Sequence, residues 1–521
     1  MCAMNRRTAL GIMAGCAPAI WTRRASAFDV PGLEIRKGKF QGTRESLKQY
    51  EVPRWYRDAK FGIWAHWGPQ SAPEQGDWYA RNMYIQGSAQ YKFHVAQFGH
   101  PSKVGFKDVI PTWKGDQFDA EHLIGMYKKA GAKYFVSMGV HHDNFDMWDS
   151  KHNRWNAAQM GPKKDIVGLF HKAAMKNGLR FGVSEHLWIS YKWFAVSHGS
   201  DKSGPMAGVP YDGRDPKLAD LYHDAECEKW ANDPRVAFTD DGIPDSWRKH
   251  WFDRIKDLVD NYQPDLLYTD GHLPFEEYGC AAVANLYNTS AAKHGGKVEA
   301  VYNTKLRDDC VTGTCVLDFE RGVANTIEPN VWQTDTCIGN WHYKRGIKYK
   351  TPKTVVDMLV DIVSRNGNLL LNFPLPNNGA LDPDELKVLE GVTSWMAVNS
   401  EGIYATRPWK IAADGPSTDA SKAADAHFNE RNRKDLSAKD VRFTTKGDKT
   451  LYAFLMGWPE GQAVVAPLGT GSPQNPAKIT NVQLLGHKGK VEWKQEADGL
   501  KVTMPQEKPS EHAVTLKVTM A

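Results

Sequence analysis

The feature that most constrains the fold is the regular alternation of short buried strands with amphipathic helices over roughly the first four hundred residues. Ala120, Leu123, Ile124 and Tyr127 keep the i, i+3, i+4, i+7 spacing of a helix, and similar stripes recur between the apolar runs. Seven runs predict strands: 61–65, 134–140, 179–184, 266–269, 298–303, 316–320 and 368–373. This alternation predicts a parallel sheet with helices on both faces.

Chemically versatile side chains follow at least five of these strands, at the point where each strand ends. They are His66, His141-His142, Glu185-His186, Asp270 and Glu320. The strand ends of a (β/α) barrel converge on one mouth, whereas an open sheet gathers such residues at a single crevice. The sequence therefore predicts an α/β fold of the (β/α)8 TIM-barrel type, and we expect the eighth strand within the aromatic, glycine-rich connections.

The pattern changes after a predicted helix at 384–398. Short strand-like stretches separated by Gly, Pro and Asn turns then follow from about residue 441 to the end, which is typical of a small β-sandwich. We expect a catalytic barrel at 28–405 and a C-terminal β-sandwich at 406–521. The polar span 412–439 is interpreted as a linker or a long insertion, and 197–244 as an elaborated loop near the barrel mouth.

The first 27 residues predict an export signal. Asn5-Arg6-Arg7 precedes an apolar stretch at 11–21 and then Ala25-Ser26-Ala27, as in a twin-arginine signal peptide with a small-residue cleavage site. The stretch is too short for a membrane anchor, so we expect a periplasmic or extracellular protein without a membrane span. Cys310 and Cys315 could pair in such a compartment, but their spacing alone does not predict a disulfide.

Charge and aromatic content narrow the class of ligand. With 66 Lys and Arg against 61 Asp and Glu, and no basic block, the chain is unsuited to a phosphate backbone, so nucleic acid is not expected as a partner. The 19 Trp, 19 Tyr and 20 Phe are more informative. Most will lie in the core, but aromatic faces also pack against the apolar faces of sugar rings.

Several motifs along the predicted barrel together resemble the α-L-fucosidases of glycoside hydrolase family 29. The first are the runs AKFGIWAHWG at 59–68, DWYARNMY at 77–84 and AGAKY at 130–134, which leads to HHDNF at 141–145. The match continues in order through FGVSEH at 181–186, YTDG at 268–271, WQTDT at 332–336 and NGNLLLNFP at 366–374. The resemblance therefore covers essentially the whole predicted barrel.

This resemblance implies hydrolysis of terminal α-L-fucosyl residues from glycans with retention of configuration. The family nucleophile corresponds to Asp270, whose position at a strand exit before Gly271 suits attack on an anomeric carbon. A helix-capping role is the alternative for this Asp. A second carboxyl must act as acid and base, and we assign Glu320, with Glu328 as its main competitor.

Other assignments of the second carboxyl stay open. Asp318 and Asp335 are further candidates, and Arg321 could hold Glu320 in a structural ion pair instead.

For fucose recognition the resemblance points to residues whose donors and acceptors would bind hydroxyl groups. They are His66, Asp77, Trp78, His141 and His142, to which we add Glu185 and His186 from the exit of the third strand. Trp341 falls where the family places an aromatic ring against the C6 methyl of fucose. The chain departs from common family residues at Asp77, at Asn303-Thr304-Lys305, at Trp341-His342-Tyr343 and, relative to some members, at Glu185-His186, which affects single contacts rather than the reaction.

Two rival interpretations remain. His66, His141, His142, His186 and Asp270 could ligate a divalent metal, although the first strand lacks a His-x-His pair and adjacent histidines on an extended strand point to opposite sides. Alternatively, the chain is a non-catalytic fucose-binding protein. We expect neither a metal nor another cofactor.

Overall fold

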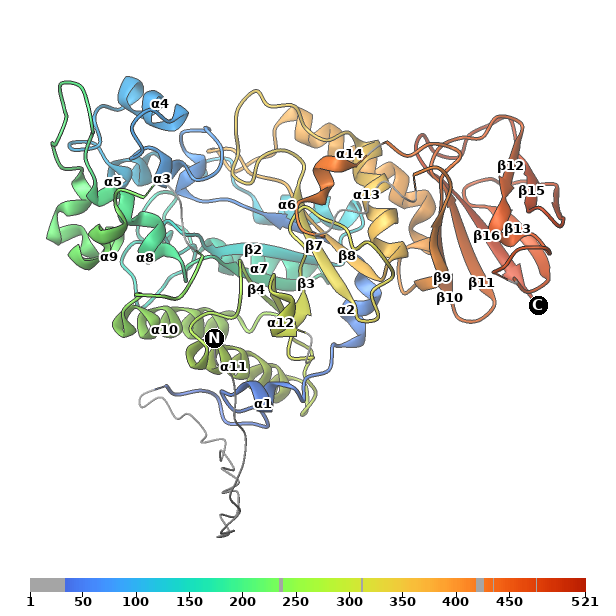
Figure 1. The fold of residues 1–521 in the computed structure, drawn as a ribbon, viewed down its shortest axis with the longest axis horizontal. Helices are drawn as coiled ribbons and strands as arrows, with labels where there is room; N and C mark the ends of the chain where they lie inside the picture. Colours follow the sequence, from blue (N-terminus) through green and yellow to red (C-terminus); the bar gives the residue numbers. More distant parts are fainter. Residues whose placement is uncertain (1–32, 234–237, 311–312, 418–425, 434, 475) are drawn as a thin grey trace, which may run out of the picture.

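The computed structural model describes residues 33–521 except 234–237, 311–312, 418–425, 434 and 475 (Figure 1). The predicted signal peptide at 1–27 lies outside the described residues. Eight parallel strands form one sheet in the order β6-β5-β4-β3-β2-β1-β8-β7. They are β1 (Phe61–Ala65), β2 (Tyr134–Val140), β3 (Arg180–Glu185), β4 (Leu266–Thr269), β5 (Val301–Thr304), β6 (Val316–Leu317), β7 (Trp332–Cys337) and β8 (Gly367–Asn372). The predicted (β/α) barrel is confirmed.

The strand missing from the sequence prediction is β7. Four of the six residues in its sequence, WQTDTC, are polar, yet every residue is buried, because polar side chains of a barrel strand can point into the interior near the mouth. The prediction of a strand over 316–320 was too long, since β6 ends at Leu317. Beyond β6 the chain still bonds to β7, as Phe319 N–H donates to the Gln333 carbonyl at 2.9 Å and Arg321 N–H to the Asp335 carbonyl at 2.8 Å. These bonds nearly close the ring.

Helices cover the outside of the barrel, and local sequence sets their ends. Asp119 caps α6 (Ala120–Lys129) and Asp165 caps α7 (Ile166–Asn177) by accepting backbone N–H bonds. Gly178 ends α7 in the left-handed conformation, with φ of 70°. The other long helices are α10 (Asp245–Tyr262), α11 (Glu277–Lys293), α13 (Pro352–Ser364) and α14 (Pro383–Asn399). Shorter ones are α1 (Arg44–Leu47), α2 (Arg54–Ala59), α3 (Tyr79–Asn82), α4 (Ala89–Gln97), α5 (Phe106–Val109), α8 (Ser190–Trp193), α9 (Ala219–Tyr222) and α12 (Arg307–Cys310).

The C-terminal part consists of antiparallel strands in two sheets, as predicted for a sandwich (Figure 1). The larger sheet has the order β13-β16-β11-β10-β9 and the smaller one β12-β15-β14. Their bounds are β9 (Arg407–Asp414), β10 (Val441–Lys446), β11 (Thr450–Leu455), β12 (Gln462–Val465), β13 (Ile479–Leu484), β14 (Trp493–Gln495), β15 (Leu500–Thr503) and β16 (Val514–Met520). The sheets enclose a hydrophobic core of their own that includes Phe443, Leu451 and Leu516.

Helix α13 joins the two parts, because it packs against β8 of the barrel and against β9 and β10 of the C-terminal sheet. Buried Asp361 of this helix pairs with Arg365, the residue directly after the helix, and, at 2.5 Å, with Arg442 on β10. Arg433 lies 3.5 Å away on the connection between β9 and β10. Removing one partner of such a buried charge cluster is costly, so these contacts fix the two parts against each other.

Of the span interpreted as a linker or an insertion, 412–439, residues 412–414 belong to β9, and described residues of the connection from β9 to β10 return to the barrel. Within this connection, Phe428 N–H donates to the Glu320 carbonyl at 2.7 Å and Glu430 N–H to the Arg321 carbonyl at 2.9 Å. The loop predicted at 197–244 contains α9 and several 3₁₀ turns rather than only irregular backbone. Both segments reach the mouth of the barrel, since Phe238 and Phe428 line the same cavity there.

Cys310 and Cys315 form a disulfide between α12 and β6. Within the described residues, every helix is too short or too polar to cross a lipid bilayer.

Candidate active site

A cavity of about 460 Å³ opens at the carboxyl ends of the barrel strands, within the size range of small-molecule sites. Its walls include eight of the ten residues that the sequence analysis assigned to the site: Asp270, Glu320, His66, Asp77, Trp78, His141, His186 and Trp341. The other lining residues are Trp64, Phe238, Gly271, Lys305, Asp335 and Phe428. Residues from many separate strand exits thus meet in one place, as expected for a barrel mouth.

Asp270 follows β4 and is fixed by its backbone. Its N–H donates to the Glu185 carbonyl at 3.1 Å, and its own carbonyl accepts from the Trp188 indole at 2.7 Å. Gly271 has φ of 125° and lies against Trp188, where a Cβ atom would come within 2.9 Å of the ring. A side chain at position 271 would therefore be strained and crowded, so glycine is required next to this carboxylate.

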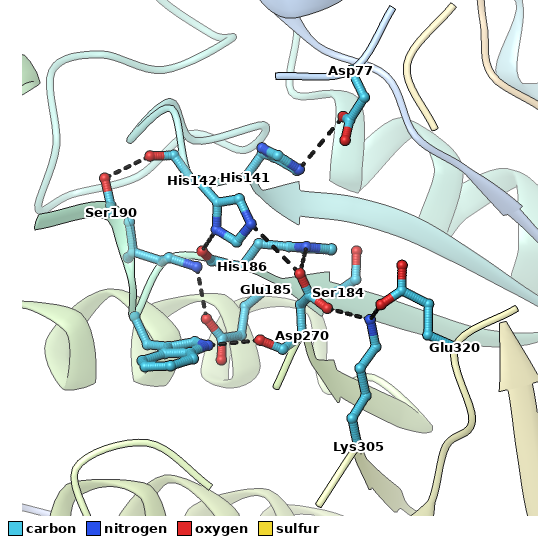
Figure 2. A network of polar contacts seen from close by, with 12 residues as sticks. Asp77, His141, His142, Ser184, Glu185, His186, Ser190, Asp270, Lys305 and Glu320 are labelled. Carbon is cyan, nitrogen blue, oxygen red and sulfur yellow. Dashed lines mark hydrogen bonds and ion pairs between the residues drawn. The ribbon is translucent and has the colours of Figure 1, made fainter. Parts of the chain in front are cut away.

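Three cationic or hydrogen-bonding side chains surround the carboxylate of Asp270 (Figure 2). His186 Nδ1 lies 3.0 Å and His142 Nε2 3.5 Å from Oδ2, and Lys305 Nζ lies 2.5 Å from Oδ1. Burial by itself would raise the pKa of Asp270, but the charge of Lys305, with His186 and His142, outweighs burial and holds that pKa well below its usual range. Asp270 is thus ionised at neutral pH, as a nucleophile requires.

Lys305 also contacts the second predicted carboxyl, because its Nζ lies 2.5 Å from Glu320 Oε2 (Figure 2). The facing oxygens of Asp270 and Glu320 are therefore at most about 5 Å apart. This separation is close to the roughly 5 to 5.5 Å between the carboxyl groups of retaining glycosidases and shorter than the roughly 6.5 to 9.5 Å in inverting ones.

Glu320 has the opposite electrostatic environment from Asp270. Burial raises its pKa to about 7, and the nearby charges of Asp335 and Asp270 add to this rise, although Lys305 opposes it. A carboxyl with such a pKa can donate a proton near neutral pH and take it back later. Two carboxyls in one cavity with pKa values pushed apart are the usual arrangement for separate nucleophilic and acid/base roles.

The competing carboxyls lie in other surroundings. Glu328 is outside the cavity, where it pairs with Arg307 at 3.2 Å. Asp318 is buried and accepts from the Gln333 amide at 2.7 Å; burial, reinforced by Asp335, raises its pKa well above the usual range. Asp335 lines the cavity but accepts from the Tyr268 hydroxyl at 3.0 Å and lies 3.8 Å from Lys305.

Arg321 does not take the place of Lys305 beside Glu320. Its guanidinium donates to the Cys337 sulfur at 2.8 Å and lies 4.9 Å from the centre of the Trp341 ring.

A group of imidazole rings forms one wall of the cavity. The rings of His66, His141 and His186 have centroids 4.8 to 5.6 Å apart, and burial lowers the pKa of each. Neutral imidazoles offer one donor and one acceptor each, which suits sugar hydroxyl groups. Trp341 packs beside His66 with ring centroids 5.3 Å apart and adds an apolar surface.

Asp77 and His342, two of the departures from the family pattern, contact each other. Asp77 Oδ1 lies 2.6 Å from His342 Nδ1 and 4.0 Å from His141 Nε2. The unusual acid at position 77 is thus accompanied by an unusual base at position 342.

Two of the predicted binding residues, Glu185 and His142, do not line the cavity. The Glu185 carboxylate is fully buried and accepts from Leu187 N–H at 2.9 Å and from the Trp251 indole at 3.1 Å. His142 lies behind Asp270, with Nδ1 2.5 Å from the His186 carbonyl. Both residues position the loop that carries His186 and the carboxylate of Asp270, rather than presenting a polar group to the cavity.

One of the two sequence arguments against a metal was that adjacent histidines would point apart, and the structure contradicts this argument. Because β2 ends at Val140, the rings of His141 and His142 lie beyond the strand and have centroids only 4.4 Å apart. Three groups of side chains bring three possible ligand atoms within 4.8 Å of one another: His66, His141 and His186; Asp77, His141 and His342; and His142, His186 and Asp270.

Sequence reasoning did not assign roles to Lys305, Phe238 or Phe428. Lys305 carried a usable signal, since it directly follows β5 at a strand exit. Phe238 and Phe428 carried none, because both come from long polar stretches with no strand before them.

The arrangement defines a class of enzyme. A parallel barrel that presents an ionised carboxylate and a protonatable one about 5 Å apart, within a wall of imidazole and indole rings, is built for the hydrolysis of glycosidic bonds. Comparison with known proteins narrows this class.

The sequence model of the family described as Alpha-L-fucosidase matches residues 31–401, and that of the Alpha-L-fucosidase C-terminal domain matches 433–519. The chain therefore belongs to the α-L-fucosidase family and is a glycoside hydrolase of class EC 3.2.1.51. It is 27% identical to tissue alpha-L-fucosidase of Rattus norvegicus over 491 residues, 91% of each chain. It is 28% identical to plasma alpha-L-fucosidase of Homo sapiens over 485 residues, covering 90% of this chain and 89% of that protein.

The fold is shared with solved structures of this kind. The Thermotoga maritima alpha-fucosidase in complex with fucose superimposes with a TM-score of 0.68 at 22% identity, covering 92% of this chain and all of that one. An alpha-L-fucosidase from Bacteroides thetaiotaomicron gives a TM-score of 0.61 at 19% identity, covering 90% of this chain and 95% of that one.

Proposed function

We propose that the chain is an exo-acting, retaining α-L-fucosidase that removes terminal α-L-fucosyl residues from oligosaccharides or polysaccharides by double displacement. The observation that carries this proposal is the position of Lys305 between two carboxyls whose pKa values are shifted in opposite directions. Asp270 is the nucleophile and Glu320 the acid and base.

In the first step Glu320 donates its proton to the glycosidic oxygen while a carboxylate oxygen of Asp270 attacks the anomeric carbon. The bond from this carbon to the leaving oxygen breaks, and a covalent fucosyl ester of Asp270 forms. In the second step the ionised Glu320 takes a proton from water, the water oxygen attacks the same carbon, and Asp270 departs as a carboxylate. Two inversions give fucose with its original configuration.

Lys305 supports both steps through its position. It stabilises the negative charge of Asp270 before attack and after release, and it opposes the rise in the pKa of Glu320 that burial causes. His186 and His142 hold the attacking carboxylate in a fixed orientation through Oδ2.

Fucose recognition is assigned to the imidazole wall and to the aromatic rings. His66, His141 and His186 bind hydroxyl groups, the pair of Asp77 with His342 binds another, and Trp341 packs against the C6 methyl. A methyl group packed on indole favours a 6-deoxy sugar over its hydroxylated counterpart.

We also propose that residues 1–27 are an export signal and that the mature barrel and sandwich divide near residue 405. Amino-terminal sequencing of the protein recovered from the periplasm or medium tests the cleavage site, which we expect after Ala27.

Chemical rescue tests the central assignment. Asp270→Gly removes the nucleophile and should lower kcat/KM by at least about 10⁴-fold, while fucose affinity is largely kept. Azide can then attack the anomeric carbon in place of the missing carboxylate, and the product should be a β-fucosyl azide of inverted configuration. Activity near that of the wild type in this variant, or rescue without the azide product, would remove Asp270 from the nucleophile role.

The possible metal sites in the cavity justify a direct test of a metal-dependent hydrolase. Dialysis against a chelator should leave activity unchanged if the two carboxyls carry the reaction. Loss of activity that zinc or manganese restores would favour the metal mechanism. Release of nitrophenol from a nitrophenyl α-L-fucoside excludes a protein that only binds fucose.

A further inference from the structure

Two phenylalanines stand out at the mouth of the cavity because they are exposed. Among the described residues, Phe238 and Phe428 are the aromatic members of the few large apolar side chains that face solvent, at 45% and 48% exposure, and both line the cavity. Scattered exposed apolar residues are normal, but exposed rings gathered at one active site indicate contact with a ligand.

The two rings lie on different sides of the reacting groups. Phe238 packs near Trp78, His142 and Trp188, which belong to the Asp270 side. Phe428 is bonded through its backbone N–H to the carbonyl of Glu320. The acid must reach the oxygen of the leaving group, so whatever the fucosyl unit is attached to has to lie on the Glu320 side, next to Phe428.

The backbone around Phe428 is held in an unfavourable conformation. Phe428 has φ of 55°, in the left-handed region that bulky residues avoid. His427 accepts from the Glu320 N–H at 3.1 Å, and Glu430 pairs with Lys350 at 2.6 Å, so the segment is anchored on both sides of Phe428. Gly322 lets the segment approach, since a Cβ there would lie 1.9 Å from the Ala426 carbonyl oxygen. Strain that the surroundings maintain in this way is characteristic of functional positions.

We propose that Phe428 is the platform of a leaving-group subsite, on which the apolar face of the pyranose that carries the fucosyl residue packs. The proposal rests on the acid/base role of Glu320 and extends it to the second sugar of the substrate. A ring that projects into solvent beside the acid presents its face to the leaving sugar without crowding the fucose pocket, which lies among the histidines.

Two substrates that need the same proton but differ in the leaving group test this proposal. Both α-L-fucosyl-(1,2)-galactose and methyl α-L-fucoside release a poor leaving group that depends on Glu320, but only the first has a ring to pack on Phe428. In Phe428→Ala the ratio of kcat/KM on the disaccharide to kcat/KM on the methyl fucoside should fall about tenfold. Phe428→Trp should restore the ratio to within about twofold of the wild type.

A control and a second readout separate ring packing from a disturbed acid. Val464→Ala, an equally exposed position on β12, should leave the ratio unchanged. With α-L-fucosyl fluoride as donor, Phe428→Ala should also lower transfer to lactose relative to transfer to methanol by about tenfold, since lactose would use the same platform.

The outcomes have distinct meanings. Equal losses on both substrates and with both acceptors would overturn the proposal, because Phe428 would then act only by positioning Glu320. An unchanged ratio would overturn it as well. If the wild-type enzyme released fucose of inverted configuration as its first product, this would instead contradict the covalent intermediate on which the proposed function depends.

Discussion

The two sides of the cavity are stabilised by parts of the chain that lie at very different distances in sequence. On the Asp270 side, support comes from neighbouring strand exits: His142, His186 and Trp188 all lie within the two preceding barrel units. On the Glu320 side, the backbone is bonded to His427 and Phe428, about one hundred residues later, in an insertion of the C-terminal sheet.

This contrast shows that one site combines support from within the barrel with support from the C-terminal part of the chain. Asp270 is positioned by barrel geometry that any member with the same strand exits would share. Glu320 is positioned by a connection between β9 and β10, the kind of surface segment that tolerates change. We therefore expect the Asp270 side to set the reaction and the Glu320 side to set its efficiency and range.

The sharpest test of the comparison is removal of the acid. Glu320→Ala should lower kcat/KM by about 10³-fold on a substrate with a poor leaving group and far less on a nitrophenyl fucoside, which departs without protonation. Glu328→Ala, outside the cavity, serves as the matched control and should retain most activity on both substrates. Similar losses for the two substrates in the Glu320 variant would assign the acid to another group.

Lys305 bonds to both Asp270 and Glu320, so its removal should affect the two sides together. Lys305→Met should lower kcat/KM about 100-fold and raise the pKa of both Asp270 and Glu320, since the positive charge lowers both. Both limbs of the pH profile should then move to higher pH. Lys305→Arg keeps the charge and should leave the limbs near their original positions. Limbs that stay fixed in the methionine variant would show that Lys305 does not set the protonation of the pair.

Substitution of Gly322 should disturb only the contacts on the Glu320 side of the cavity. Gly322→Ala places a Cβ against the Ala426 carbonyl and should push the 426–430 segment away, lowering kcat/KM about tenfold on a poor leaving group with little change on a good one. Gly125→Ala on α6 meets no atom within 4 Å and is the matched control, with unchanged activity and slightly higher thermal stability. Equal effects of the two substitutions would remove the segment from any role in positioning the acid.

The smallest expected effect is the fall in kcat/KM on the alkaline side of the pH profile of the wild-type enzyme. The acid must be protonated to act, and burial places its pKa at about 7, so kcat/KM on a poor leaving group should fall about twofold between pH 5.5 and pH 7 and more steeply above. The same profile on a good leaving group should be flatter. A limb that begins only above about pH 9 would contradict the assignment of Glu320.

The sequence predicted the barrel, the antiparallel C-terminal part and most of the residues around the cavity, because strand exits are recorded locally as an apolar run followed by a polar residue. It missed β7, because its WQTDTC sequence has four consecutive polar residues, all buried, instead of the apolar run by which the other strands were found. It did not predict a role for Phe428, because no local pattern shows that a polar, turn-rich span contacts Glu320, which lies about one hundred residues earlier in the sequence. Glu185, which the sequence analysis assigned to fucose binding, does not line the cavity, since a strand exit fixes the position of Cα but not the direction of the side chain.

The 426–430 segment has a consequence for how such enzymes diversify. The connection between β9 and β10 bonds to the backbone of Glu320 at the barrel mouth. We therefore expect that the barrel and the C-terminal part cannot be exchanged between relatives independently of each other. A chimaera that joins this barrel to another member's C-terminal half would inherit that member's contacts beside Glu320. New preferences for the glycan beyond fucose can thus arise through changes outside the barrel, while the reacting centre stays the same.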